Sequence, residues 1–262
     1  MMSDRPVPVE RAPIPIDLAV VSALPQEIAA VAEVLGFSEA LSAGTFPRIS
    51  PRGDTPDRRS AVCIATGAGK TCAARGMALL LERYRPAHIL AMGIAGSAAD
   101  GVDVGDFVVG CRAWYYDVDA TALGIAYGTV VPGGVEHYDL HHPERDLVWL
   151  HGLIAAVSSG KARVHLGAVA TGDTFVDAAA LGALPRRWRE RIGESAAVDM
   201  ESAAWAEAVS PYGIPITVVR MISDHVHTGG RLPFRRACAR IGEVAARRLL
   251  TGSEEHIGGL GG

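Results

Sequence analysis

Short apolar segments that alternate with helix-like segments constrain the fold of this chain most strongly. Residues 16–23 are an apolar, β-rich run, Pro25 follows at a position favoured in the first turn of a helix, and Gly36 closes the helical spacing of residues 26–35. The same order recurs along the chain. The spacing predicts strands at residues 16–23, 61–66, 87–92, 104–109, 164–170, 197–200 and 216–222, and helices at residues 26–35, 70–84, 147–157, 201–209 and 237–250.

Strands that alternate with helices predict an α/β fold, with a single domain whose mainly parallel central sheet is flanked by helices in a three-layer αβα arrangement. The 262 residues are 49% hydrophobic and include 30 glycines, which suits a buried sheet with many tight turns. We expect the domain to span residues 16–250, with a disordered tail at residues 1–15 and a flexible tail at residues 251–262.

Two segments lack regular spacing. Residues 43–60 are polar and predict an exposed loop or a poorly paired hairpin. Residues 112–140 are rich in aromatic side chains, and a loop of that length inside a domain is usually functional or unusually structured. These aromatic side chains fit either a core beneath the loop or the wall of a pocket.

The composition argues against several classes of partner. A formal net charge of −4 gives no electrostatic reason to expect nucleic acid or an anionic membrane as a partner. The amino terminus is polar and proline-rich, unlike a signal peptide, and no apolar run reaches the length of a membrane span. Scattered cysteines without a paired pattern predict a reduced, cytoplasmic protein; they are Cys63, Cys72, Cys111 and Cys238.

Three motifs resemble ligand sites without matching them. Residues 66–71 look like the end of a phosphate-binding P-loop, but that pattern requires a glycine where Ile64 stands, so a glycine turn that caps a helix is the better interpretation. The pair Gly93 and Gly96 does not make the dinucleotide pattern. Two groups of histidines match no standard zinc spacing, so we expect neither a metal nor a cofactor; they are His137, His141 and His142, and His225 and His227.

Carboxylates follow several of the predicted strands. Glu27 lies just after the first strand, Asp199 and Glu201 lie where a short strand gives way to a helix, and Asp224 follows the last strand. Each of them alone is more simply explained as an acidic residue that stabilises or caps a helix start. Because ligands of α/β sheets bind at the carboxyl ends of the strands, the four together indicate a site there.

Six blocks in the same order resemble the methylthioadenosine/S-adenosylhomocysteine nucleosidases of the nucleoside phosphorylase and nucleosidase family. The resemblance runs over about residues 16–250 and implies a nucleoside phosphorylase-like fold. The blocks are residues 23–27, residues 66–70 with 92–96 and 104–106, residues 115–121, residues 171–176, residues 198–201 and residues 220–224.

The resemblance implies a role for each matched residue. Asp224 would protonate N7 of the purine, Glu27 with Arg220 would hold and activate water, and Glu201 would accept hydrogen bonds from the ribose 2′ and 3′ hydroxyls. The remaining matched residues would bind substrate: Met200 against the sugar, Phe175 stacked on the base, the backbone of Val176 at the base edge, and Ser223, Asp199, Gly96 and Ile94 around them.

The chemistry requires these residue types. A purine anion is a poor leaving group, so an acid must protonate it, and we expect a raised pKa for Asp224. Nearby carboxylates stabilise the cationic sugar, and water attacks its opposite face with a carboxylate as base. The chain departs from the family pattern at Ile94, where a small hydroxyl residue is usual, at Asp199, where Glu is usual, and at Ile125, where an aromatic residue is expected.

Other functions stay open on the sequence. A phosphate-dependent purine nucleoside phosphorylase is the first alternative, although no arginine precedes residues 92–96 and Glu27 would repel phosphate. A nucleosidase for a different 5′ substituent, a nucleoside-binding protein that has lost activity, and a nucleotide-binding α/β protein are the others. The resemblance also implies a homodimer that acts on a small purine nucleoside.

Overall fold

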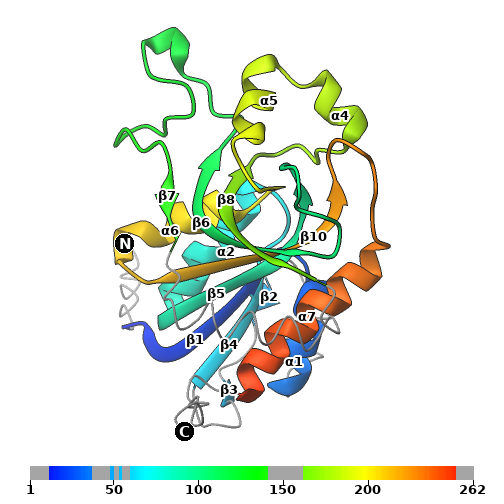
Figure 1. The fold of residues 1–262 in the computed structure, drawn as a ribbon. Helices are drawn as coiled ribbons and strands as arrows, with labels where there is room; N and C mark the ends of the chain where they lie inside the picture. Colours follow the sequence, from blue (N-terminus) through cyan, green and yellow to red (C-terminus); the bar gives the residue numbers. More distant parts are fainter. Residues whose placement is uncertain (1–11, 37–47, 50–52, 55–59, 141–161, 252–262) are drawn as a thin grey trace, which may run out of the picture.

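The computed structural model describes residues 12–36, 48–49, 53–54, 60–140 and 162–251. Four strands run parallel through the middle of the molecule in the order β4 (Ser60–Ala65), β1 (Ile14–Ser22), β5 (Tyr84–Ser97) and β10 (Ile216–His225), as Figure 1 shows. Their apolar runs are buried on both faces, as in other parallel sheets covered by helices. The predicted α/β class and the strand positions in this half are confirmed.

The other half of the sheet is antiparallel where it joins the first. β10 pairs antiparallel with β6 (Phe107–Tyr115), which pairs parallel with β8 (Val164–Thr171). β8 pairs parallel with β9 (Ala197–Asp199), and β9 returns antiparallel to β5. These pairings close a barrel-like ring, so the sheet is mixed and the predicted mainly parallel arrangement is confirmed only in part. The physical reason is the short connection 98–106, which contains no crossover helix and so returns the chain antiparallel.

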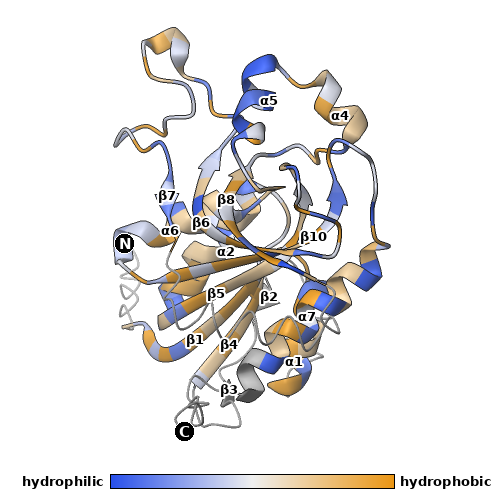
Figure 2. Cartoon of the chain, in the orientation of Figure 1, coloured by the Kyte–Doolittle hydropathy of each residue, from blue (hydrophilic) through white to orange (hydrophobic). Residues whose placement is uncertain are grey.

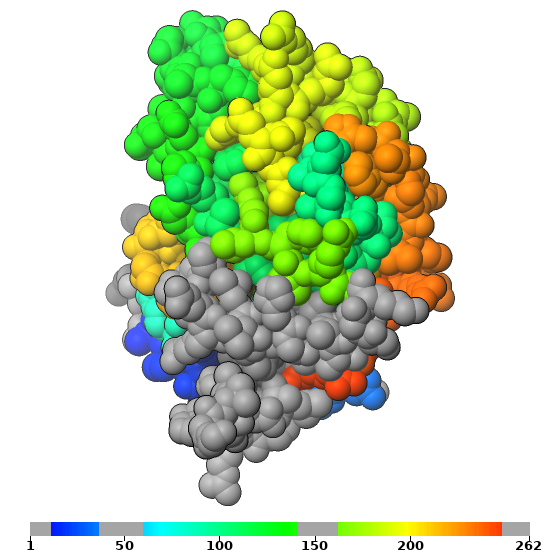
Figure 3. Space-filling model, viewed as in Figure 1, coloured from blue at the N-terminus to red at the C-terminus, as the bar shows by residue number. Residues whose placement is uncertain are grey.

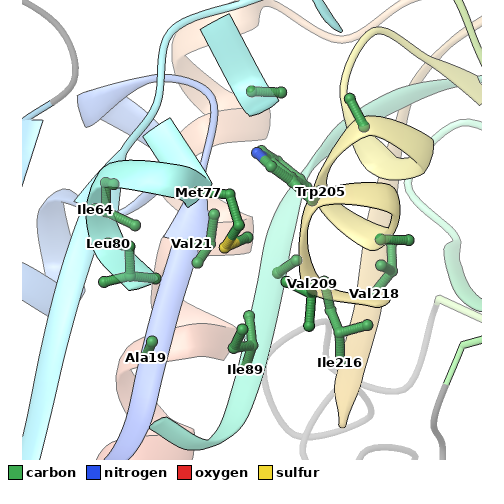
Figure 4. Close-up of a cluster of buried hydrophobic side chains, with 14 of the residues drawn as sticks. Ala19, Val21, Ile64, Met77, Leu80, Ile89, Trp205, Val209, Ile216 and Val218 are labelled. Atoms are coloured by element: carbon green, nitrogen blue, oxygen red, sulfur yellow. The ribbon is translucent and has the colours of Figure 1, made fainter. Parts of the chain in front are cut away.

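Helices cover both faces of β1, β4 and β5. Because side chains alternate along a strand, Leu18 and Val20 face α1 (Ala29–Val34) and α7 (Phe234–Thr251), whereas Ala19 and Val21 face α2 (Lys70–Arg83) and α6 (Ser202–Val209). Figure 4 shows the second face, where Trp205 of α6 packs near Met77 of α2. Figure 2 shows the strands between these helices as largely hydrophobic.

Gly93 and Gly96 lie beyond residue 92, where the sequence predicts that the third strand ends. Both lie inside β5, where Gly93 pairs with Arg220 and Gly96 with Asp224 of β10. Neither has a positive φ. A Cβ atom at Gly93 would overlap the Arg220 guanidinium, so glycine is needed there for close approach rather than for a turn.

The sequence did not predict two helices, α4 (Ala178–Ala183) and α5 (Arg186–Gly193). The irregular segment ahead of β7 (Tyr138–Asp139) packs against α5, and Figure 3 shows the segment in green next to the yellow atoms of α5. Arg187 contacts Asp119, and Arg191 donates to the carbonyl of Glu136. The three aromatic side chains at the end of β6 and just after it, Trp114, Tyr115 and Tyr116, are buried in the core, as the first of the two interpretations predicts.

Short elements complete the described chain: η1 (Pro25–Glu27), η2 (Thr121–Leu123), η3 (Ser210–Tyr212), and β2 (Arg48–Ile49) and β3 (Gly53–Asp54), which pair antiparallel with β4. The predicted helix at residues 147–157 and most of both predicted tails lie outside the described residues. None of the described helices combines the length and apolar character needed to cross a membrane.

Candidate active site

Glu27 lies in η1, shortly after β1, and two backbone amides donate hydrogen bonds to its side chain. Pro25 begins the 3-10 turn η1, which carries the Glu27 side chain into the protein, where it is buried. Its Oε2 accepts a hydrogen bond from Leu24 N at 2.8 Å and its Oε1 accepts one from Ile94 N at 3.0 Å. Burial raises the pKa of Glu27, and the positive charge of Arg220 opposes that rise.

Arg220 extends from the middle of β10 and is fully buried. Its Nη2 lies 2.5 Å from Asp199 Oδ2 and 3.5 Å from Glu201 Oε2, and its Nε donates to Ser202 Oγ at 3.1 Å. The guanidinium also stacks 4.8 Å from the ring centre of Trp205. Its Nη1 has no partner, although it lies beside Gly93 together with Glu27 Oε1.

Asp199 has most of its hydrogen-bonding capacity taken up by the protein. Thr171 Oγ1 donates to Asp199 Oδ1 at 2.6 Å, and the hydroxyl of Ser202 donates to Oδ2. The amide of Ser202 and the Arg220 guanidinium contact the same carboxylate. We infer that Asp199 orients Arg220 rather than binding substrate directly, which is a different role from the one the resemblance implies.

Glu201 lies at the start of α6, between Arg220 and the turn after β4. Its Oε1 accepts a hydrogen bond from Gly69 N at 3.1 Å. Burial, followed by the charges of Asp199 and Glu27, raises the pKa of Glu201 to about 8, against the opposing charge of Arg220. Three buried carboxyl groups therefore lie around one buried guanidinium.

Asp224 is the second-last residue of β10, where it pairs with Gly96 of β5. Ser223 Oγ donates to Asp224 Oδ1 at 2.6 Å, and a Cβ atom at Gly96 would come within 3.2 Å of Asp224 Oδ2. Burial raises the pKa of Asp224, as the sequence predicts, while the Ser223 hydrogen bond and Arg231 act against the rise. A carboxyl group with such a raised pKa can act as a general acid.

The predicted base-binding residues differ in exposure. Val176 is buried among core side chains, whereas the Phe175 side chain is 59% exposed and free to contact a ligand. Met200 is half-buried between Asp199 and Glu201.

The histidines form no metal site in the described part of the chain, where no cluster of potential metal ligands occurs. His225 and His227 contact each other edge to face, and His137 lies near Asp139, while His141 and His142 lie outside the described residues.

Sequence reasoning missed several residues that organise this site. Thr171 and Ser202 hold Asp199, and the amide of Gly69 holds Glu201. Thr171 and Gly69 each stand in a block that resembles the family, but their spacing from the carboxylates along the chain gives no sign of contact.

The sequence model of the phosphorylase superfamily matches residues 17–252. The chain belongs to the phosphorylase superfamily. Within this superfamily it is 33% identical over 198 residues to the 5′-methylthioadenosine/S-adenosylhomocysteine nucleosidase of Geobacillus thermodenitrificans, a match that covers 74% of this chain and 79% of the relative. The resemblance read from the sequence is thus confirmed.

Solved structures of this superfamily share the fold. The methylthioadenosine/S-adenosylhomocysteine nucleosidase of Colwellia psychrerythraea in complex with adenine is 25% identical with a TM-score of 0.69, covering 89% of this chain and 94% of that chain. The nucleosidase of Neisseria meningitidis in complex with methylthio-immucillin-A is 28% identical with a TM-score of 0.69, covering 88% and 96%.

Proposed function

We propose that this member of the phosphorylase superfamily hydrolyses the N-glycosidic bond of 5′-methylthioadenosine and S-adenosylhomocysteine, releasing adenine and the corresponding thioribose. The nucleosidase relatives and the adenine complex support the substrate class. The observation that carries the proposal is the placement of Arg220 and Asp224 on β10 next to Gly93 and Gly96 of β5, with Glu27 and Glu201 buried beside Arg220.

Asp224 acts on the leaving group. Burial raises its pKa and so favours the protonated carboxyl group, which donates its proton to N7 of the adenine as the bond between C1′ and N9 breaks. The bonding electron pair moves into the purine, which therefore leaves as neutral adenine. Ser223 holds the carboxyl group in place through its hydroxyl.

Glu27 and Arg220 act on water. No direct ion pair joins them, yet Glu27 Oε1 and the unpartnered Arg220 Nη1 both lie against Gly93. A water molecule there donates to Glu27 and accepts from Nη1; its oxygen bonds to C1′ and Glu27 takes the proton. The carboxylates around Arg220 stabilise the positive charge that develops on the sugar.

The departure at Ile94 leaves this arrangement intact, because the backbone amide rather than the side chain contacts Glu27. The Ile94 side chain is partly buried and packs against the hydrophobic core. We propose that Glu201 accepts hydrogen bonds from the ribose hydroxyls, with Met200 against the sugar and with Phe175 and Val176 at the base.

We also propose a cytoplasmic homodimer. The resemblance to the family supports a dimer, and exposed apolar side chains offer surface for a partner, namely Leu123 at 79%, Val131 at 53% and Phe175 at 59% exposure. Light scattering after size exclusion tests the oligomeric state: a mass near twice 27.4 kDa supports the dimer, and a mass near 27.4 kDa contradicts it.

The function is tested by assaying free base in phosphate-free buffer with methylthioadenosine, S-adenosylhomocysteine, adenosine and inosine. We expect release from the first two, reduced about 10²–10⁴-fold in Asp224→Asn because the general acid is lost. Asp139→Asn is the matched control, since that carboxylate is 79% exposed at β7. Equal rates in wild type and Asp224→Asn would contradict the assignment of the acid, and no release from either thioether would contradict the substrate.

A further inference from the structure

The turn that resembles a P-loop carries a lysine whose charge is already neutralised within the protein. Lys70 Nζ lies 2.6 Å from Asp117 Oδ1 and 3.7 Å from Asp173 Oδ2, and it lies 5.3 Å from the ring centre of Tyr115. The Lys70 backbone amide donates to Asp173 Oδ1 at 2.7 Å. A lysine held in this way is not a phosphate ligand, so its ammonium group has another use.

The two acidic partners of Lys70 are also joined to each other. Asp173 N donates to Asp117 Oδ2 at 3.0 Å, which closes a triangle of contacts. Lys70 begins α2 after β4, Asp117 follows β6, and Asp173 follows β8. This triangle, which we name the Lys70 triad, connects three strand ends that are far apart in the sequence, and the Lys70 side chain is only 23% exposed.

The residue before Lys70 makes the contact that matters for the site. Gly69 has a φ of +89° and donates its amide hydrogen to Glu201 Oε1 at 3.1 Å. A Cβ atom at Gly69 would come within 3.1 Å of Asp173 Oδ1, so the turn packs tightly against the triad. The direction of the Gly69 amide therefore depends on where the triad holds the start of α2.

We propose that Lys70 is a positioning residue: through Asp117 and Asp173 it fixes the Gly69 amide on Glu201 and so orients that carboxylate toward the ribose hydroxyls. This inference rests on the proposed function. Because Asp173 also begins the segment that carries Phe175 and Val176, the same triad couples the ribose subsite to the base subsite.

The test compares Lys70→Met with wild type on methylthioadenosine and on its 2′-deoxy analogue. Methionine keeps the length and apolar stem but removes the charge. We expect kcat/KM for methylthioadenosine to fall about tenfold or more, as for loss of a hydrogen bond to a charged group. The fall should be clearly smaller for the 2′-deoxy analogue, which lacks one hydroxyl that Glu201 contacts. Lys70→Arg should restore part of the loss.

A control variant, a second test variant and one measurement that needs no catalysis accompany this comparison. Arg83→Met removes a cation from the exposed end of the same helix and should leave both substrates unchanged. Asp117→Asn opens the triad from the other side, keeps side-chain size, and should reproduce the substrate-dependent loss if Lys70→Met does not fold. Amide hydrogen exchange over residues 66–71 should be faster in Lys70→Met, a readout that needs no catalysis.

Equal losses on both substrates, or no loss in Lys70→Met and Asp117→Asn, would overturn the inference. Unchanged exchange over residues 66–71 would overturn it as well. Inactivity of the wild-type protein on both substrates would instead overturn the proposed function, and the exchange measurement would still test the Lys70 triad.

Discussion

Arg220 is the residue on which the geometry of the site depends. Its guanidinium is fully buried and contacts Asp199, Glu201 and Ser202 through two of its nitrogen atoms. The third, Nη1, is left for a ligand beside Glu27. A buried hydrogen-bond donor without a partner is unfavourable, so Arg220 Nη1 is suited to bind one acceptor atom of a ligand or water. The residues that hold Arg220 therefore matter as much as those that touch substrate.

At this scale, Glu27→Gln tests the base. Glutamine keeps the shape but accepts from only one of the two amides and cannot take a proton, so kcat should fall about 10²–10⁴-fold. Burial raises the Glu27 pKa above 4.5, so wild-type kcat/KM should decline as pH falls through that raised pKa, and the variant should lack this limb. Glu33→Gln on α1, where the carboxylate is exposed, is the matched control. A pH profile identical to wild type in Glu27→Gln would reject Glu27 as base.

Glu201→Gln tests the cost of the buried charge. The folded-state pKa of about 8 lies above the ordinary 4.5, so the stability linked to Glu201 protonation is fully present below pH 4.5 and is lost as pH rises through 8. Glutamine stays neutral, so the Tm of the variant should exceed that of wild type increasingly from pH 5 to pH 9. Each kcal/mol corresponds to about 2–4 °C in a domain of this size.

Differential scanning fluorimetry across that range measures the effect, with Glu82→Gln on the exposed face of α2 as control. A Tm difference that shrinks toward pH 9 would mean that Glu201 is ionised in the folded protein well below pH 8.

Among the elements, β5 connects the two halves of the site. It pairs with β1, β10 and β9, and its glycines allow Arg220 and Asp224 of β10 to approach its backbone. Figure 1 shows it at the centre of the sheet. A side chain at Gly93 has no room on either side, because Glu27 Oε1 would lie 2.9 Å away and the guanidinium would overlap.

Gly93→Ala should therefore reduce the free energy of unfolding by about 1–3 kcal/mol through overpacking, and it should also abolish activity by displacing Arg220. Gly182→Ala in α4 is the matched control, because nothing lies within 4 Å of its Cβ position, and a helical alanine there should stabilise by about 0.4–1 kcal/mol. Urea unfolding measures both. A Gly93→Ala protein as stable and active as wild type would show that Arg220 lies elsewhere.

The sequence predicts helices and strands well where the spacing of apolar residues is regular. It predicts them poorly where contacts between distant segments determine the local structure. The strands at residues 16–23 and 216–222 and the helix at 70–84 differ from the structure by only a few residues at their ends. The strand predicted at residues 87–92 continues in the structure through Gly93 and Gly96, where the close approach of Arg220 and Asp224 requires glycine. Helix α5 contains few apolar residues, so the sequence has no regular helical pattern there. Pro185, directly before its first residue, is the feature that could have indicated a helix start.

For the molecule as a whole, alternation of strands and helices predicts the α/β class but not the closed ring of strands. The direction of β6 and β9 depends on a short connection and on pairing with β10 and β5, and neither is visible in apolar spacing. Of the four carboxylates that follow strands, Glu27, Asp199 and Glu201 lie around Arg220, and Asp224 lies further along the same strand, β10. Their roles come from contacts that only the fold creates, such as Thr171 with Asp199.

The central claim concerns the nucleophile, and the most direct measurement is the sugar product formed with and without phosphate. Adenine release from methylthioadenosine is followed in phosphate-free buffer and in excess phosphate, while phosphorus NMR monitors any sugar phosphate. The account predicts equal rates under both conditions and no sugar phosphate, because Glu27 and Arg220 Nη1 direct water to C1′. Release that requires phosphate, with sugar 1-phosphate as product, would contradict it.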